Sequence, residues 1–346
     1  MVGKSQKNPF ALPADDLARI LRQASGNFDL LRGKSLFLTG GTGFFGKWLL
    51  GALIHANAEL GLGLKLTVLS RNPTGFRQKY PELDNSSIVR FMPGHVADFA
   101  LPADHFDYVI HAAADTVIVS SEAEERERSR AIVQGTRHML ELARKNGARF
   151  LNVSSGAVYG SLAGQPGGAK EDDYAGATPL IPYAEAKREA EELCADSDVD
   201  FVTARAFAFL GPCLPLEAHF AAGNFLRDVL RGGPIQVRGD GTALRSYLYP
   251  TDLVAWLLRI LLRGERGRAY NVGSAETVST AQLARLIADA VNPAMEVTIQ
   301  SIQPLGPQNI YLPDVTRART ELSLEVTIPL REAIARTLAF LRDAHS

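Results

Sequence analysis

Residues 35–46 read Ser35-Leu36-Phe37-Leu38-Thr39-Gly40-Gly41-Thr42-Gly43-Phe44-Phe45-Gly46, and the fold can be worked out from them. The first five residues are a short apolar run typical of a buried strand, and the glycines behind it lead into a helical pattern. A strand, a glycine turn and a helix in this order begin a βαβ unit. Glycine is needed in such a turn because a Cβ would prevent tight turning and close approach of a phosphate to the backbone.

Further short apolar runs follow along the chain, and helical patterns separate most of them. Short buried strands that alternate with helices indicate βαβ units around a parallel sheet. Because the crossovers are right-handed, we expect an α/β fold with a Rossmann-like, doubly wound parallel sheet. The expected strands lie at 35–39, 66–69, 88–91, 108–110, 150–153 and 201–203, and the expected helices include 128–146 and 183–195.

The rhythm of strands and helices changes after about Gly211, where proline and glycine become frequent and the apolar runs become shorter. We expect a smaller C-terminal α/β lobe here, with a cleft for a substrate between it and the sheet. The predicted organisation is a loose N-terminal leader and a short helix capped by Asp15 or Asp16 (1–32), a dinucleotide-binding Rossmann domain (33–211), and a mainly substrate-binding lobe (212–346).

The composition excludes several kinds of partner. The 346 residues include 37 Lys and Arg and 38 Asp and Glu, a net charge of −1, which gives no electrostatic basis for binding nucleic acid or an anionic membrane. The two cysteines, Cys194 and Cys213, provide neither a disulfide framework nor a metal site. No apolar run reaches the roughly 18 residues of a membrane span. We therefore expect a cytoplasmic protein with no metal, membrane or nucleic-acid partner.

The glycine loop predicts a dinucleotide site, the alternative being a purely structural turn. The helix that begins near Gly43 directs its free N–H groups and the positive end of its dipole at a pyrophosphate. A second strand follows about two dozen residues later, as the motif requires. The residues expected at the cofactor in this loop are Gly40, Thr42, Gly43, Phe44, Phe45 and Gly46.

The end of the second strand bears on the choice of cofactor. An NAD enzyme usually carries an acid there for the adenosine ribose, but this chain has Ser70-Arg71-Asn72. No carboxylate repels a 2′-phosphate and Arg71 can pair with one, which favours NADP(H) while NAD stays possible. The alternative is that Arg71 stacks on adenine or is solvated. Asp98, after the third strand, is expected either to accept a hydrogen bond from the adenine amino group or to cap a helix.

Tyr183 and Lys187 lie four residues apart in a helical pattern, so their side chains share one face. A cation about 4 Å from the phenol is worth roughly 4 kcal/mol, or about three pKa units, which would bring the tyrosine pKa from about 10 to about 7. Such a tyrosine can pass a proton to or from a substrate hydroxyl. Ser154 and Ser155 end the fifth strand, where a hydroxyl can hold the reacting oxygen. The alternative is a surface tyrosine above a solvated lysine.

These motifs, in this order, resemble those of the extended short-chain dehydrogenase/reductase family, also called the NAD-dependent epimerase/dehydratase family. The resemblance extends from roughly Gly33 to Leu341. The matching segments are Thr39–Gly46, His111–Ala114, Ser154–Gly160, Pro179–Lys187, Gly211-Pro212, Gly239–Thr242 with Arg245, and Tyr270–Gly273.

The resemblance implies roles for individual residues. Tyr183 is then the acid/base, Lys187 tunes its pKa and holds the nicotinamide ribose, and Ser155 binds the reacting oxygen with help from Ser154. The segment with Ala112 and Ala113 belongs to the cofactor site.

The resemblance also implies a nucleotide-sugar substrate. Arg245 is expected at its diphosphate, where a guanidinium can pair with two oxygens, and Asn224 at its base. The family further implies a homodimer in which the helix of Tyr183 takes part in a four-helix bundle.

The chain departs from the family pattern just after Ser155. Family 4,6-dehydratases need an acid pair there, and the decarboxylating branch keeps an acid nearby, but this chain has Gly156 and Ala157. Neither side chain can move a proton, so we expect neither reaction. Asp115 and Thr116, past the fourth strand, are expected either to contact the sugar or to cap a helix.

Three functions remain. The first is an NADPH-dependent reductase of an NDP-4-keto(-6-deoxy)hexose, which the Ser70-Arg71 pair favours. The second is an NDP-sugar 4-epimerase with tightly bound NAD. The third, of another class, is a catalytically silent NADP-binding sensor or scaffold. Two other patterns suggest structure alone: His111 as a core histidine, and the charge run from Glu122 to Arg130 as a solvated helix face.

Overall fold

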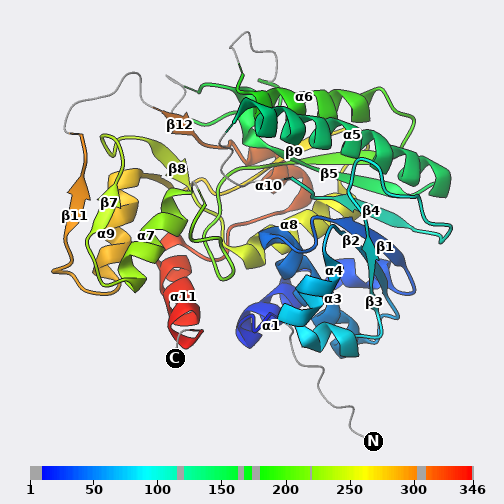
Figure 1. The fold of residues 1–346 in the computed structure, drawn as a ribbon, viewed down its shortest axis with the longest axis horizontal. Coiled ribbons are helices and arrows are strands. Elements are labelled where there is room, and N and C mark those ends of the chain that lie inside the picture. Colours follow the sequence, from blue (N-terminus) through cyan, green and yellow to red (C-terminus); the bar gives the residue numbers. More distant parts are fainter. Residues whose placement is uncertain are drawn as a thin grey trace, which may run out of the picture.

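The computed structural model describes residues 10–114, 121–162, 167–173, 180–218, 220–301 and 309–344. Its centre is a seven-stranded sheet in the order β3-β2-β1-β4-β5-β6-β9, and every neighbouring pair is parallel (Figure 1). The order reverses between β1 and β4, as in a doubly wound sheet, so the predicted fold class is confirmed. The strands are β1 (Ser35–Thr39), β2 (Lys65–Ser70), β3 (Val89–Pro93), β4 (Tyr108–His111), β5 (Arg149–Ser155), β6 (Phe201–Ala206) and β9 (Ala269–Val272).

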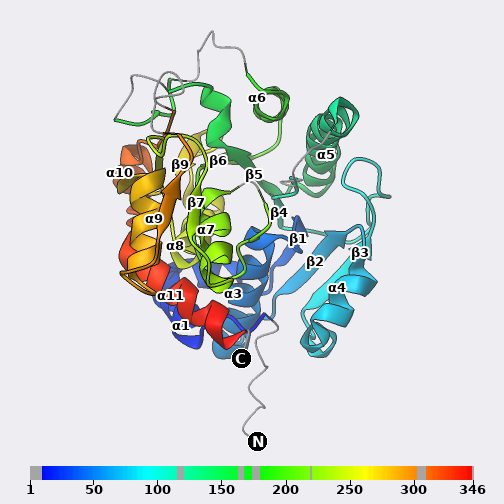
Figure 2. The same cartoon turned by 60° about the vertical axis from the view of Figure 1, so that its left-hand side comes forward.

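Helices cover both faces of this sheet. One face packs against α5 and α6, and the other packs against α3 and α8, with α1 behind them (Figure 2). Strands buried on both sides explain the continuous apolar runs in the sequence. The bounds are α1 (Ala14–Gln23), α2 (Ser25–Phe28), α3 (Phe44–Leu60), α4 (Pro73–Lys79), α5 (Glu122–Asn146), α6 (Pro182–Ala195), α8 (Pro250–Arg263) and α10 (Thr316–Leu322).

Helices α5 and α6 have clear start signals in the sequence, and α5 also has a clear stop signal. In α5, the Ser121 hydroxyl accepts a hydrogen bond from the Glu124 amide (3.3 Å), and Gly147 ends the helix at φ +61°. Helix α6 begins at Pro182, whose missing N–H costs nothing in a first turn. The tyrosine of the predicted site is the next residue, so it sits at the very start of α6.

The N-terminal segment differs from its prediction. Residues from Phe10 onward are packed rather than loose, and the Phe10 ring lies 5.0 Å from the Tyr80 ring. Neither aspartate at the start of α1 caps the helix. Asp16 is instead buried, where it accepts hydrogen bonds from the Tyr249 hydroxyl (2.5 Å) and from Arg336 (2.9 Å). A buried carboxylate needs such partners, and these tie α1 to the C-terminal part of the chain.

The C-terminal part of the chain belongs partly to the central sheet and partly to a separate lobe. Strand β9 is an edge strand of the central sheet and α8 packs against this sheet. The domain boundary predicted from the sequence, at 211–212, places both in the substrate lobe. The remaining elements form a lobe with its own apolar core, a mixed sheet β10-β8-β12 and a parallel pair β11-β7. Its elements are α7 (Ala221–Leu230), β7 (Ile235–Val237), β8 (Leu244–Ser246), β10 (Thr277–Ser279), α9 (Thr280–Asp289), β11 (Val297–Ile299), β12 (Ile310–Tyr311) and α11 (Leu330–Asp343).

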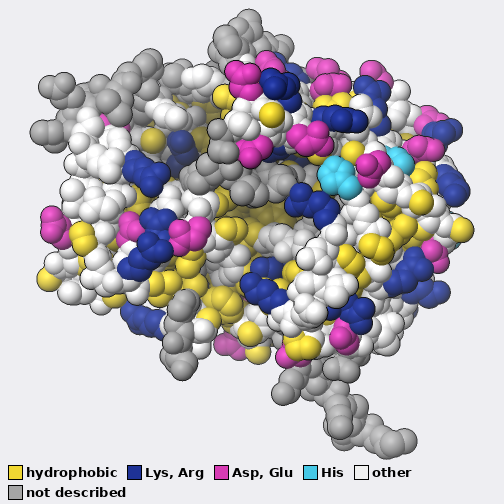
Figure 3. Space-filling model, in the orientation of Figure 1, with side chains coloured by type: hydrophobic (Ala, Val, Ile, Leu, Met, Phe, Trp, Pro, Cys, Tyr) yellow, Lys and Arg dark blue, Asp and Glu magenta, His cyan; other side chains and the backbone are white. Residues whose placement is uncertain are grey.

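The surface is hollowed between this lobe and the sheet domain, with hydrophobic side chains inside the hollow and lysine and arginine side chains around it (Figure 3). The carboxyl ends of β1, β4 and β5 are the usual location of a ligand in such a sheet. Among the helices of the described residues, none has the length and apolar character needed to cross a bilayer.

Candidate active site

The glycine loop after β1 has no room for side chains. Gly40 has φ +72°, and a Cβ on it would lie 2.4 Å from the Ala112 carbonyl oxygen. A Cβ on Gly46 would lie 2.3 Å from the Gly40 carbonyl oxygen. The first turn of α3 therefore packs directly on the loop. Gly43 precedes that helix and no side chain caps it, so its first N–H groups are available to an anion. These features fit the pyrophosphate of a dinucleotide.

The end of β2 carries no carboxylate. Ser70 is buried and its hydroxyl accepts a hydrogen bond from the Asn72 amide (3.2 Å), while Arg71 is exposed. Asn72 in turn caps α4 through the Gly75 amide (2.9 Å). Asp98 lies exposed in a turn after β3, and no helix begins between β3 and β4, so the helix-cap alternative for Asp98 is wrong. Its contact with adenine stays a prediction.

Buried hydrogen bonds join the end of β4 to the end of β1. The Thr39 hydroxyl lies 2.9 Å from His111 Nδ1 and accepts a hydrogen bond from the Ala113 amide (3.2 Å). His111 is buried, and this burial lowers its pKa to about 3. A neutral histidine in this place is structural, as the sequence suggested. It holds Ala112 and Ala113 beside the glycine loop.

Three hydroxyl groups meet where β5 ends. Tyr183, at the start of α6, lies beside Ser155, the last residue of β5, and the Ser155 hydroxyl acts to lower its pKa. The hydroxyl of Tyr311 lies 3.3 Å from the Ser155 hydroxyl on its other side. Tyr311 comes from β12 of the C-terminal lobe, 156 residues further along the chain. No local pattern in the sequence indicated Tyr311, because only the tertiary fold brings β12 to this strand end.

The electrostatics around Tyr183 differ from the prediction. Burial raises the pKa of Tyr183, while its hydrogen bond to Ser155 and the charge of Arg128 oppose that rise. Lys187 is buried and its Nζ donates to the Val153 carbonyl oxygen (2.9 Å). Burial also lowers the pKa of Lys187 to about 8, against the effect of Glu191. The expectation that Lys187 brings the tyrosine pKa to about 7 is therefore wrong for this structure.

Ser154 points into the interior of the protein. Adjacent residues of a strand point to opposite faces, and the Ser154 hydroxyl donates to Glu191 Oε1 (2.5 Å) in the interior. Glu191 also accepts from Arg205 Nη2 (2.7 Å), and Arg205 donates to the Tyr159 hydroxyl (2.8 Å). The predicted help of Ser154 to the reacting oxygen stays a prediction, and it would require this hydroxyl to leave Glu191. Ser154 instead belongs to a buried polar network that anchors α6.

The predicted diphosphate residue does approach the catalytic group. Arg245, on β8, donates through Nη1 to the Leu244 carbonyl oxygen (2.7 Å), and its Cζ lies 5.7 Å from the centre of the Tyr311 ring. Tyr311 therefore lies between Arg245 and Ser155. Asn224, the residue expected at the base, lies on α7, where its side-chain oxygen accepts from Arg227 Nη1 (3.1 Å). Two further predicted residues, Asp115 and Thr116, lie outside the described residues.

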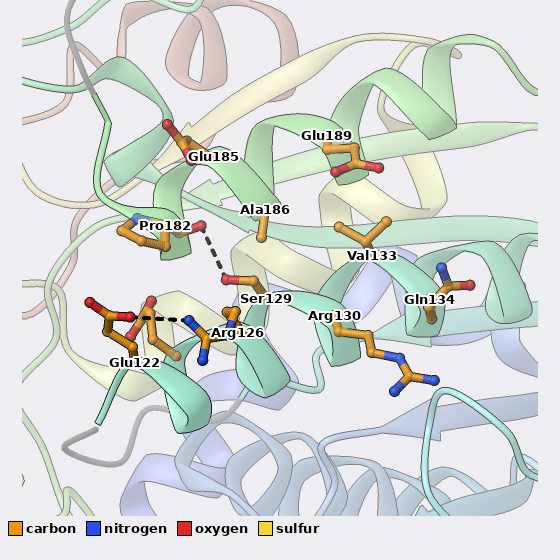
Figure 4. A pocket seen from close by; sticks show the side chains of 11 residues that line it. Glu122, Arg126, Ser129, Arg130, Val133, Gln134, Pro182, Glu185, Ala186 and Glu189 are labelled. Carbon is orange, nitrogen blue, oxygen red and sulfur yellow. Dashed lines mark hydrogen bonds and ion pairs between the residues drawn. The ribbon is translucent and has the colours of Figure 1, made fainter. Parts of the chain in front are cut away.

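A groove of about 590 Å³ lies between α5 and α6 (Figure 4). Its lining combines small or apolar side chains with a charged rim. The residues are Glu122, Glu125, Arg126, Ser129, Arg130, Val133, Gln134, Pro182, Glu185, Ala186 and Glu189.

A glycine loop after β1 and a Ser–Tyr–Lys set after β5, on a doubly wound parallel sheet, define a Rossmann-fold enzyme built for a dinucleotide. The sequence over residues 36–273 matches the NAD dependent epimerase/dehydratase family. The chain belongs to this family, and the resemblance found in the sequence is confirmed.

Individual relatives are moderately similar. UDP-glucuronic acid decarboxylase 1 of Arabidopsis thaliana is 28% identical over 315 residues, 89% of this chain and 70% of the relative. The dTDP-glucose 4,6-dehydratase of Streptomyces niveus is 26% identical over 317 residues, 89% of this chain and 93% of the relative.

Solved structures share the fold. The epimerase Mth375 of Methanothermobacter thermautotrophicus has a TM-score of 0.80 at 24% identity and covers 94% of this chain and 97% of its own. The UDP-glucose 4-epimerase of Thermotoga maritima has a TM-score of 0.76 at 22% identity, and the match covers 90% of this chain and 100% of the epimerase chain.

Proposed function

We propose that this enzyme reduces the 4-keto group of a nucleotide-activated sugar, an NDP-4-keto(-6-deoxy)hexose. The proposal rests on Ser155 and Tyr183, which lie side by side at the carboxyl end of β5 without an acid at the two following positions. Relatives named for UDP-glucuronic acid and dTDP-glucose support a nucleotide sugar as the class of substrate.

Each catalytic residue has one task in this reaction. The Ser155 hydroxyl donates a hydrogen bond to the C4 oxygen of the sugar and holds it beside Tyr183. A reduced nicotinamide, when bound, would supply the hydride that C4 needs. Tyr183 then gives its hydroxyl proton to the C4 oxygen, so the carbonyl becomes an alcohol and the tyrosinate regains a proton from solvent. Lys187, Ala112 and Ala113 would hold the cofactor, with Arg245 on the diphosphate of the substrate.

Packing around Gly156 supports the exclusion of dehydration and decarboxylation. A Cβ at Gly156 would lie 2.6 Å from the ring of Phe207. A side chain at this place, such as the acids that dehydratases carry, would therefore require the Phe207 ring to shift. Ala157, the next residue, has no ionisable group. The proposed site thus has Ser155 and Tyr183 for proton transfer at C4. It has no acid at positions 156 and 157 that could assist the loss of water or carbon dioxide from the sugar.

A 4-epimerase is the second candidate. It uses the same serine, tyrosine and lysine, and known 4-epimerases have the same fold. The two candidates differ in how they hold the cofactor, because an epimerase must retain NAD through oxidation and return of the hydride. Ser70-Arg71 at the end of β2 favours NADP(H), which is released and replaced in each cycle of a reductase.

Cofactor binding separates the candidates. We would purify the enzyme, identify any nucleotide that accompanies it, and titrate NADPH and NADH by fluorescence. The reductase should bind exchangeable NADPH in preference to NADH, and Arg71→Ala should reduce that preference by about tenfold or more. Copurified NAD with no preference for NADPH would instead favour the epimerase.

We also infer that the chain forms a homodimer through α5 and α6, and the groove between these helices supports this inference. Its mix of Val133 and Ala186 with a charged rim suits a symmetric contact between copies of the chain. Light scattering on the purified enzyme should give twice the 37.5 kDa of one chain. A mass of 37.5 kDa at micromolar concentration would contradict this inference.

A further inference from the structure

Helix α5 carries three arginines in its first turns, and they lie in different surroundings. The side chains of Arg126 and Arg130 are 71% and 73% exposed and pair with acids on the same helix. The side chain of Arg128 is only 15% exposed. Residues two apart on a helix point in nearly opposite directions, so Arg128 is buried against α6 while Arg126 and Arg130 lie on the exposed rim of the groove between α5 and α6. The charge run is therefore not a uniformly solvated face.

Arg128 lies over the ring of Tyr183. Its Cζ is 5.2 Å from the ring centre, a distance at which a guanidinium is attracted to the aromatic face. Its Nη2 donates to both carboxylate oxygens of Glu125, at 2.5 Å to Oε1. Its Nε is buried and has no hydrogen-bond partner within the described part of the chain. Glu125 thus binds the guanidinium group of Arg128 at Nη2, while the group itself lies over the Tyr183 ring.

The other charged and titratable groups near Tyr183 are already engaged. Ser155, on β5, lies beside it, and the Tyr311 hydroxyl, on β12, lies 3.3 Å from the Ser155 hydroxyl. Lys187, on its own helix, donates to a strand carbonyl. Arg128 is the cation that lies on the phenol ring, and Glu125 is the carboxylate paired with that cation.

We propose that Arg128 is a positioning residue for Tyr183: its guanidinium orients the phenol toward Ser155 and stabilises the negative charge left on the ring when the proton is given up. The inference rests on the proposed function, in which Tyr183 is the proton donor. A tyrosinate in an apolar site needs a nearby positive charge. Arg128 provides it from α5, and Glu125 limits its strength because the carboxylate cancels part of the field.

The titration of Tyr183 tests this directly and needs no substrate. We would label the enzyme with tyrosine carrying an isotope at Cζ, assign the Tyr183 signal with Tyr183→Phe, and follow it against pH by NMR. Arg128→Gln should raise the Tyr183 pKa by about one unit, and Arg128→Lys should restore most of the wild-type value. Glu125→Gln should lower the pKa, since it removes the opposing charge. Arg130→Gln, the exposed neighbour, should leave it unchanged.

Equal Tyr183 pKa values in wild type, Arg128→Gln and Glu125→Gln would overturn the proposal. If Arg128→Gln does not fold, Glu125→Gln and Arg128→Lys decide the question alone. In turnover, Arg128→Gln should move the pH profile of kcat in the same direction and leave KM for the nucleotide sugar within about twofold. If the titration shifts but no 4-keto sugar is reduced, the proposed function fails while the role of Arg128 in positioning Tyr183 stands.

Discussion

Lys187 is the residue whose environment has the most direct consequence for stability. Its ammonium is buried and its pKa lies at about 8, below the ordinary value of 10.5. A lysine in this state carries a desolvation cost as long as it is charged. The cost is consistent with a functional position, because a lysine beside a nicotinamide ribose gains partners when the cofactor binds.

Replacing Lys187 should change how stability depends on pH. The folded-state pKa lies below the unfolded one, so the unfolded chain binds more protons between about pH 8 and 10.5. The free energy of unfolding attributable to Lys187 should therefore rise with pH across this window, by up to about 3 kcal/mol. Denaturant unfolding of Lys187→Met should lack this rise. A parallel pH dependence in wild type and variant would show that Lys187 is not desolvated.

Gly156 gives a second residue-scale prediction. Because the Phe207 ring lies 2.6 Å from the place of a Cβ, Gly156→Ala should lower the free energy of unfolding by about 1–3 kcal/mol. Gly26→Ala is the matched control, since a Cβ there meets no atom within 4 Å. Thermal and denaturant unfolding measure both. Equal stability of the two variants would mean that the Phe207 ring moves aside at little cost. Packing would then not explain why position 156 carries no acid.

At the scale of elements, α6 is held by a buried ion pair. Glu191 lies two turns beyond Tyr183 and accepts hydrogen bonds from Ser154 and Arg205. Arg205, on β6, also donates to the Glu171 carbonyl oxygen (2.8 Å). The network connects α6 with β5 and β6, so it sets the position of the helix that carries the tyrosine and the lysine. A buried pair of this kind gives little net stability but is costly to break.

Glu191→Gln should therefore destabilise the enzyme by about 3–5 kcal/mol, since it leaves the charge of Arg205 without its carboxylate. Glu122→Gln, which breaks the exposed pair with Arg126, should cost at most about 1 kcal/mol. Urea unfolding of the two variants compares them. Similar small losses in both would indicate that water or another group replaces the carboxylate.

The elements that the sequence predicts correctly are those determined locally. The glycine loop, the strand before it and the α6 face with Tyr183 and Lys187 follow from spacing and periodicity, which the tertiary structure does not override. The alternation of side chains along a strand already indicates that Ser154 and Ser155 point to opposite faces. The expectation that both serve the reacting oxygen came from the family resemblance instead. Arg128 was missed because an alternating charge run does not show which of its members points at a neighbouring helix.

In the molecule as a whole, the candidate site forms where the C-terminal lobe contacts the central sheet. Tyr311 brings the C-terminal lobe into contact with Ser155, and Arg245 of the same lobe lies against the Tyr311 ring. Contacts between residues this distant in sequence depend on how the lobe docks on the sheet, which no short pattern encodes. The lobe thus adds a hydroxyl and a cation to the residues around Ser155 at the end of β5.

Under the proposed function, hydride and proton transfer meet at C4 of a nucleotide sugar, with Tyr183 as the proton donor. The most direct measurement is the oxidation of NADPH by the purified enzyme with an NDP-4-keto-6-deoxyhexose, followed by absorbance and product analysis. We predict that wild type consumes NADPH and forms the 4-hydroxy sugar, and that Tyr183→Phe is at least about a hundredfold slower in kcat with unchanged NADPH affinity. Unimpaired reduction by Tyr183→Phe, or no NADPH oxidation with any such sugar, would contradict the claim.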